Sequence, residues 1–506
     1  MRAALLIYGA LNAILYAGLT PLWEGFDEPF HYGYVQHLRL ARSLPVQKRT
    51  CLSEEIWQSF PLAPASFIVK RNLPMVTTFD DYFRLSQAER LARRRALEQL
   101  DPKLAAADSN APNYEAQQAP LAYALLTPFD AAWARVPLPR RIWRLRLVCG
   151  LASTLAAGLF LFRLAGLLGL DEHATHAAVF LAFSSQMFYA TTAHVTNDYL
   201  ALPLFLLVLV SAIDLFLKPR RAAVLMLSIA LAGGLLTKAY FLALIPFAAA
   251  VVLARCDWRD RALFAAAGLL PAAPWYVRNL VLYRDLAGLQ ENVGGIPMAS
   301  MVSDALHLPW ARALVTTLKT SFWEGNSSAT TFGAATLCLM ILLLASALAG
   351  VLIRRPRGAP LVLIAGLASF AAGLVYNTVI QWRATNGVGI TPAPWYVQLL
   401  FPPAFCLLVA GAGRLLRIGL CWLWAYVIVA TYIAKLIPLY GGHSGRPARL
   451  IELARWYTGS FPQIREILAS AAMIPPLALF ALTALVAGIS VLLVWHITQP
   501  FFRSHK

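Results

Sequence analysis

Residues 3–22 read AALLIYGALNAILYAGLTPL, and the chain continues directly as Trp23-Glu24-Gly25-Phe26-Asp27-Glu28-Pro29-Phe30-His31. The first stretch is long and apolar enough for a helix that crosses a membrane. Two adjacent carboxylates and an imidazole therefore follow at the point where such a helix leaves the bilayer. Ionisable groups at this depth are costly, so they are by default a candidate functional site.

The composition indicates a membrane protein along its whole length. The 506 residues are 59% hydrophobic and 13% charged, with a mean hydropathy of +0.61. A soluble domain of this size could not bury so much apolar side chain. The formal charge of +18 does not indicate a nucleic-acid partner, because the basic residues cluster in short loops beside apolar runs. The six cysteines match neither a disulfide framework nor a metal-ligand spacing.

The apolar runs predict an all-α integral membrane protein with about twelve transmembrane helices. We place these helices at residues 3–22, 146–169, 174–193, 199–217, 222–237, 239–254, 262–277, 329–352, 359–379, 397–413, 418–438 and 471–496. Residues 222–254 could also form one broken hairpin around Lys238. The basic loops then share one face, which the positive-inside rule assigns to the cytoplasm; these loops are 218–221, 255–261, 354–357, 414–417 and 503–506.

The predicted helices divide the chain into five parts. These are a first helix (1–22), a large first extracytoplasmic loop with amphipathic helices (23–143), helices two to seven (144–278), a second extracytoplasmic segment (279–328) and helices eight to twelve (329–506). In the large loop, the spacing of Ser86 and Glu89 is typical of a capping box and predicts a helix. That helix, with arginines 90 and 93–95 opposite its apolar side, would lie on the membrane surface or be an ordinary solvated helix.

Polar residues from five separate turns fall on the predicted outer face. Asp27, Glu28 and His31 follow the first helix, and the other turns supply His194, Asn197 and Asp198, then Lys238, Arg278 and Arg383. Carboxylates and cations on one face suit the transfer of a group from a phosphate-linked lipid. A carboxylate would deprotonate the acceptor hydroxyl, and the cations would neutralise the phosphate that departs.

Each of these residues also has a structural alternative. Asp27 could cap a helix that begins near Pro29, and Asp198 could cap the fourth membrane helix. Both histidines could be ordinary hydrogen-bonding residues, and the basic residues could be anchors that reach the bilayer interface. We favour a functional site because all of these residues share one predicted face.

At these residues the chain resembles the GT-C superfamily of polytopic glycosyltransferases. The likeness is to the branch of protein O-mannosyltransferases and lipid A aminoarabinose transferases, together with related bacterial membrane proteins. Residues 24–31 look like the acidic motif of the first outer loop, and Asn197-Asp198 looks like the second acidic position. Residues 113–123 (NYEAQQAPLAY) are similar to a segment that usually reads near HPPLYY, and residues 274–279 (PWYVRN) to a segment that often follows a middle helix.

The sequence departs from the family pattern at a few positions. Gln118 stands where the family segment usually has His, and Ala119 and Ala122 replace a Pro and a Tyr. Trp395 precedes Tyr396 where an Arg is usual. These departures bear on the donor and the acceptor rather than on the architecture.

The resemblance implies a GT-C-like fold and a hexosyl or pentosyl transferase that uses a polyprenyl-phosphate-linked sugar. Asp27 would be the catalytic base, Glu28 would support it, and Asp198 would orient the acceptor or a bound cation. These three carboxylates would suit Mg or Mn if the enzyme uses a metal. Lys238 and Arg278 would bind the donor phosphate. The remaining substrate-binding candidates are His31, His194, Asn197, Arg383 and Tyr396.

The expected partners are the lipid-linked donor, a glycan, lipid or protein acceptor of the cell envelope, and membrane lipids, with no nucleic acid. The expected location is the bacterial inner membrane, with the site on the periplasmic side. One rival is a transporter or flippase of lipid-linked sugars, which would place ionisable residues near the bilayer midplane in two related halves. The other is a non-catalytic protein of the same fold that binds the carrier.

Overall fold

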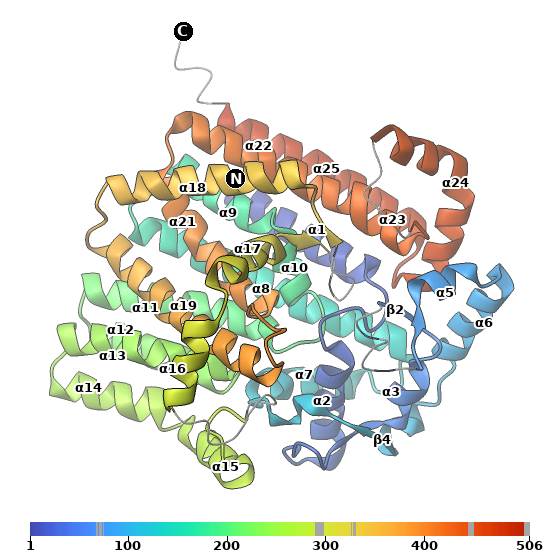
Figure 1. The fold of residues 1–506 in the computed structure, drawn as a ribbon, viewed down its shortest axis with the longest axis horizontal. Coiled ribbons are helices and arrows are strands. Elements are labelled where there is room, and N and C mark those ends of the chain that lie inside the picture. The colour runs from blue at the N-terminus through green and yellow to red at the C-terminus, as the bar shows by residue number, and fades with distance from the viewer. Residues whose placement is uncertain are drawn as a thin grey trace.

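The computed structural model describes residues 1–66, 69, 73, 75–288, 298–324, 326, 330–443 and 450–499. Within them the chain is mainly helical (Figure 1), and its strands form three short pairs. Eight helical segments there are long and apolar enough to cross a membrane, by length and composition. The chain is therefore a multi-pass helical membrane protein. The basic loop predicted at 503–506 lies outside the described residues.

Eight of the predicted membrane helices coincide with these long segments. They are α1 (Arg2–Leu19), α8 (Leu138–Leu167), α11 (Asp198–Leu217), α18 (Ala334–Ile353), α19 (Ala359–Ala384), α20 with η5 and α21 (Pro394–Val397, Gln398–Leu400 and Phe401–Gly411), α22 with η6 and α23 (Arg414–Ala430, Thr431–Leu436 and Ile437–Tyr440), and α25 (Pro476–Thr498).

The other four predicted ranges fall on helices that are shorter or interrupted. They are α9 and α10 (Glu172–Phe183 and Gln186–Thr192), α12 (Arg221–Leu235), η3 with α13 (Ala239–Leu244 and Ile245–Arg255), and α14, η4 and α15 (Trp258–Phe264, Ala265–Leu269 and Ala273–Tyr283). The predicted break at Lys238 is confirmed, because its backbone is extended between α12 and η3. Twelve spans remain a prediction, since length and apolarity alone support eight.

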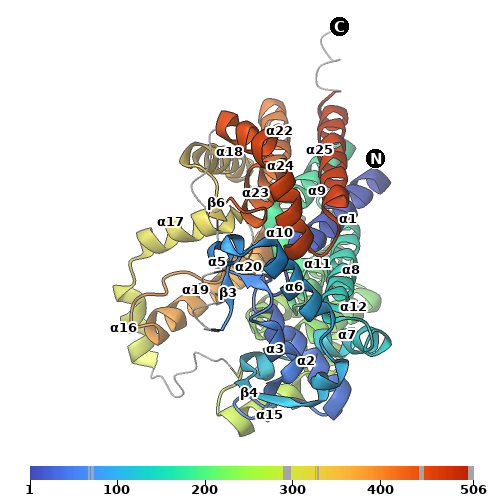
Figure 2. The ribbon, with the colours of Figure 1, turned by 90° about the vertical axis from the view of Figure 1, so that its right-hand side faces the viewer.

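The segment between α1 and α8 forms a small subdomain of its own. Its helices are α2 (Glu28–Ala41), α3 (Glu54–Ser59), α5 (Phe79–Arg84), α6 (Gln87–Glu98), η1 (Pro102–Ala106), η2 (Tyr114–Gln117) and α7 (Leu121–Ala132). Its strands are β1 (Cys51–Ser53), antiparallel to β4 (Asp108–Pro112), and β2 (Pro64–Ala65), parallel to β3 (Thr77–Thr78). Figures 1 and 2 show α2, α3, α6 and β4 gathered beside the ends of the long helices.

Two of the segments that link the later helices have elements of their own. In the first, α16 (Met298–His307) and α17 (Trp310–Ser321) precede a hairpin of β5 (Trp323–Glu324) and β6 (Thr330–Thr331). In the second, α24 (Leu450–Ala471) packs on α23 and α6.

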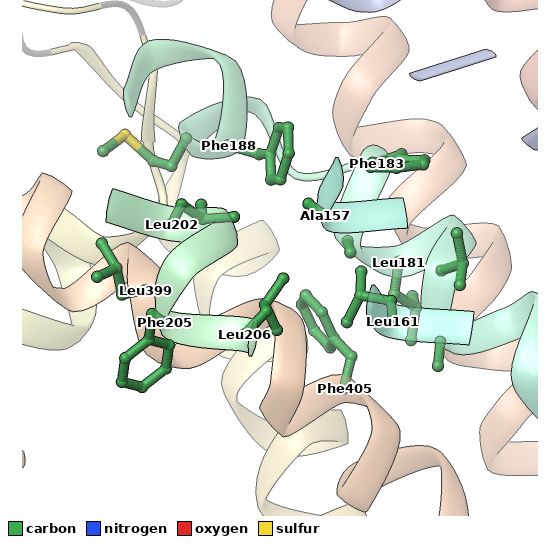
Figure 3. Packing of buried hydrophobic residues seen from close by; sticks show 14 of the residues in the cluster. Ala157, Leu161, Leu181, Phe183, Phe188, Leu202, Phe205, Leu206, Leu399 and Phe405 are labelled. Carbon is green, nitrogen blue, oxygen red and sulfur yellow. The ribbon is translucent and has the colours of Figure 1, made fainter. Parts of the chain in front are cut away.

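The core of the bundle is a continuous apolar cluster between α8, α9, α11 and α21. Leu161, Phe183, Leu206 and Phe405, one from each of these helices, belong to this cluster and are labelled in Figure 3. These helices are apolar on most faces, as helices buried inside a bundle are. Side chains at the centre are fully excluded from solvent, so the ends of these helices are held in fixed positions relative to one another.

The predicted capping-box helix forms, and Arg95 on it is exposed, but Arg90 and Arg94 make contacts inside the protein. Ser86 and Glu89 make both hydrogen bonds of the box at the start of α6. Arg90 is buried and pairs with Glu466 of α24, and Arg94 donates to the carbonyl of Ala472 at 3.2 Å. Part of the basic side of α6 therefore belongs to an internal contact, which neither predicted alternative included.

Candidate active site

A cavity of about 1010 Å³ lies between the subdomain and the bundle. Its ionisable lining residues are Asp27, Glu115 and Lys238. Its apolar lining comes mainly from η3 and α19, and α20 adds Trp395 and Tyr396; the apolar side chains include Leu242, Ala243, Phe370 and Leu374. The cavity thus joins a polar pocket to a surface made by apolar helices.

Asp27 lies at the start of α2, and its carboxylate lines the cavity. Its backbone is left-handed (φ 56°), a conformation that Asp tolerates better than most residues. Pro29 fits the first turn of the helix. The side chain makes no capping hydrogen bond, so the capping alternative is wrong. Instead, the hydroxyl of Tyr114 donates to Oδ1 of Asp27.

Asp198 reaches the same site through Lys238. The ammonium of Lys238 lies 2.7 Å from both carboxylate oxygens, and the hydroxyl of Tyr240 donates to Oδ1 at 3.0 Å. Lys238 also lies 4.7 Å from the ring centre of Tyr396. Asp198 begins α11 without a capping hydrogen bond from its neighbour Asn197. Two distant parts of the chain therefore supply one buried ion pair at the cavity wall.

Glu115 is a site residue that the sequence analysis did not single out. It belongs to η2, it is 6% exposed, and its Oε2 lies 4.0 Å from Nδ1 of His31. Burial and then the nearby charge of Asp27 raise the pKa of Glu115 well above its usual range. The carboxyl therefore holds its proton at neutral pH. It lies in the segment 113–123, but no local pattern distinguishes it there, because its protonation depends on residues distant in sequence.

Glu28 forms a buried pair with Arg146 of α8 and does not line the cavity. Nε of Arg146 lies 2.7 Å from Oε1, and the backbone N–H of Val195 donates to the same oxygen at 3.0 Å. Burial alone would raise the pKa of Glu28, but Arg146 offsets this and holds the pKa below its usual range. Glu28 thus fixes the start of α2 to α8 and to the turn before α11.

The two histidines are buried and neutral. Burial, followed by the charge of Lys238, lowers the pKa of His31 well below its usual range. Nδ1 of His31 lies 2.7 Å from the hydroxyl of Tyr123. Burial is also the main reason that the pKa of His194 falls to about 4. Neither histidine lines the cavity, whereas Asn197 donates at 3.3 Å to Gln118, which does.

The two predicted arginines lie away from the cavity. Arg278 donates to the carbonyl of Pro45 at 2.6 Å and lies 4.8 Å from the ring centre of Trp275. Arg383 pairs with Asp304 of α16 at 2.7 Å. Lys238 is therefore the one cation that the structure brings to the cavity within the described part of the chain.

The three predicted metal ligands do not converge. Arg146 neutralises Glu28, and Lys238 holds both oxygens of Asp198. Among the described residues, no group of three His, Cys, Asp or Glu side chains is placed to bind an ion. The arrangement of Asp27, Glu28 and Asp198 therefore does not fit a Mg or Mn site, and no step below depends on one.

Comparison with known proteins finds a structural likeness but no match in sequence. No protein-family model and no curated protein matches the sequence. The structure is similar to the crystal structure of ArnT from Cupriavidus metallidurans bound to undecaprenyl phosphate, at 12% sequence identity and a TM-score of 0.49. The match covers 98% of this chain and 76% of that chain. A likeness at this level does not assign a function, which has to rest on the site itself.

Proposed function

We propose that this chain is a membrane glycosyltransferase. It moves a sugar from a polyprenyl-phosphate-linked donor to a cell-envelope acceptor at the extracytoplasmic face. Asp27 acts as the general base, and Lys238 binds the donor phosphate.

The observation that carries this proposal is the composition of one cavity. Asp27 and Lys238 line it together with the apolar side chains of η3 and α19. The cavity thus has a charged part and an apolar part. A lipid-linked sugar likewise has a charged, hydroxylated head and an apolar chain. Tyr376 of α19, which is 54% exposed, also lines the cavity, so the apolar side reaches the surface of the bundle. A chain entering from the bilayer could therefore lie along α19 with its phosphate near Lys238.

The site residues divide the chemistry among them. The acceptor hydroxyl attacks the anomeric carbon, and the bond from that carbon to the phosphate oxygen breaks. The phosphate leaves with the electron pair, and its charge is stabilised by the Lys238 ammonium. The hydroxyl proton passes to Asp27, because Glu28 and Asp198 are held by cations and Glu115 is protonated. Tyr114 fixes the Asp27 carboxylate through its hydrogen bond.

The Asp27→Asn variant tests this assignment. The amide keeps the shape of the side chain but cannot take a proton, so transfer should fall about 10²–10⁴-fold, the usual worth of a general base. Binding of the polyprenyl-phosphate carrier should change little. The measurement is transfer of labelled sugar from a panel of polyprenyl-phosphate sugars by the reconstituted protein.

Asp80→Asn is the matched control, because Asp80 is exposed in the same subdomain and should leave transfer unchanged. Undiminished transfer by Asp27→Asn contradicts the role of Asp27. A wild-type protein that binds the carrier but transfers no sugar would instead indicate a non-catalytic carrier-binding protein, and one that moves the carrier across the bilayer would indicate a flippase.

A further inference from the structure

Two buried oxygens in the wall of the cavity have no hydrogen-bond partner among the residues that the structure describes. Glu115 and Gln117 of η2 are 6% and 4% exposed, and both line the cavity. Oε2 of Glu115 and Oε1 of Gln117 accept no hydrogen bond from any described residue. Buried polar atoms in folded proteins are nearly always paired. Two such atoms on one short helix beside a cavity therefore indicate a ligand that donates hydrogen bonds.

The charges around the cavity restrict what that ligand can be. The ionisable residues in the described lining are Asp27, Glu115 and Lys238, and Asp198 holds the Lys238 ammonium with both oxygens. The third proton of that ammonium is needed for the donor phosphate. A carboxylate on the ligand would be repelled by the Asp27 carboxylate, and the described lining has no second cation to neutralise it. The group beside η2 must therefore be uncharged or cationic, and hydroxyl groups meet this requirement.

Resting on the transfer reaction proposed above, we propose that Glu115 and Gln117 form the subsite for the transferred sugar, binding its hydroxyl groups, and that this sugar carries no acidic group. Both residues are then specificity-determining.

The state of Glu115 fits this role. Burial and the Asp27 charge raise its pKa, so the carboxyl is neutral at pH 7 and can both donate and accept a hydrogen bond. Two neighbouring hydroxyls of a sugar can satisfy such a group. The side-chain oxygen of Gln117 adds a further acceptor, and the Gln118 side chain beside it also lines the cavity.

The test compares carrier binding with and without a sugar. The full-length protein in lipid nanodiscs is titrated with bare polyprenyl phosphate and with the same carrier linked to neutral hexoses, neutral pentoses or a uronic acid. The wild type should bind its best neutral sugar carrier about tenfold more tightly than the bare carrier. Glu115→Ala and Gln117→Ala should each remove most of that preference while the bare carrier binds as before.

Glu115→Gln provides a sharper check. The amide is neutral and still donates and accepts, so most of the preference should remain, whereas an ionised Glu115 would lose its function in this variant. Glu54→Ala is the control, because Glu54 bonds to Gln58 away from the cavity and should leave every affinity unchanged.

Three results would overturn the inference while leaving the proposed transferase intact: tighter binding of the uronic acid carrier, equal weakening of the bare carrier in the alanine variants, or an unchanged sugar preference in them. A wild-type protein that binds neither the bare nor any sugar-linked carrier would overturn the proposed function, and this inference with it.

Discussion

Lys238 and Asp198 form an ion pair that is almost completely removed from solvent, with side chains 6% and 3% exposed. Removing two charges from water is expensive, and the cost is offset only where the geometry is good and other hydrogen bonds are present. Here both carboxylate oxygens contact the ammonium, and Tyr240 donates to one of them. Two hydrophobic side chains of similar volume in these positions would often make the protein equally or more stable. The pair is therefore best explained by the need for a cation in the cavity wall.

Lys238→Met should lower both stability and transfer. It leaves the Asp198 charge buried without a partner, which costs about 3–5 kcal/mol of unfolding free energy. Adding Asp198→Asn removes that charge and should restore most of the thermal stability, but transfer should stay low because the phosphate still lacks its cation. The measurements are the thermal unfolding midpoint in detergent and the sugar-transfer rate.

Lys103→Met, on the exposed surface of η1, is the control for loss of a lysine. If the double variant transfers sugar as the wild type does, Lys238 does not bind the phosphate. If the single variant unfolds no earlier than the wild type, the pair is not buried as described.

At the scale of elements, the site depends on connections between helices that are distant in sequence. Glu28 at the start of α2 accepts hydrogen bonds from Arg146 of α8 and from the backbone of Val195, just before α11. Arg146 also donates to the carbonyl of Pro21, two residues after the end of α1. The Glu28–Arg146 pair therefore helps to position both aspartates. Asp27 directly precedes Glu28, and Asp198 lies three residues after Val195, whose backbone N–H donates to Glu28.

Glu28→Gln should destabilise the protein at neutral pH and much less in acid. The Arg146 charge loses its partner, at a cost of about 3 kcal/mol at pH 7. The folded-state pKa of Glu28 lies below the unfolded value of about 4.5, so its stabilisation is present above that pH and is lost as the pH falls through the folded pKa. The gap between the unfolding midpoints of the wild type and the variant should narrow below about pH 4.5. A gap that is absent at pH 7, or that widens in acid, would contradict this role.

Which elements form could be predicted from the sequence, because apolar runs and capping boxes are local signals. The twelve predicted ranges fall on helices, and the capping box of Ser86 and Glu89 is present. The partners of single side chains could not be predicted in this way. Arg90 reaches Glu466 across 376 positions, and Arg278 reaches the backbone of Pro45 across 233. Sorting residues by membrane face grouped Asp27, Asp198, Lys238 and Tyr396 with Arg278 and Arg383. The structure places the first four at or beside one cavity and the two arginines elsewhere.

For the whole molecule, the essential feature is that one cavity has a charged part and an apolar part. The charged part comes from the subdomain and the start of η3, and the apolar part comes from η3 and α19. Glu115 shows why sequence alone could not define it: its character is set by burial and by Asp27, which is 88 positions away along the chain. The arrangement of the bundle, rather than any single motif, creates a place for a lipid with a polar head.

Crosslinking of a photoreactive polyprenyl phosphate to the protein tests this arrangement most directly. The reconstituted full-length chain is irradiated with a carrier that bears the reactive group near its phosphate, and the labelled peptides are identified by mass spectrometry. We predict labels on η3, α19 and α20, around Leu242, Leu374 and Tyr396, which excess unlabelled carrier suppresses. Suppressible labels confined to the opposite end of the bundle, such as the 354–357 loop, would contradict the account.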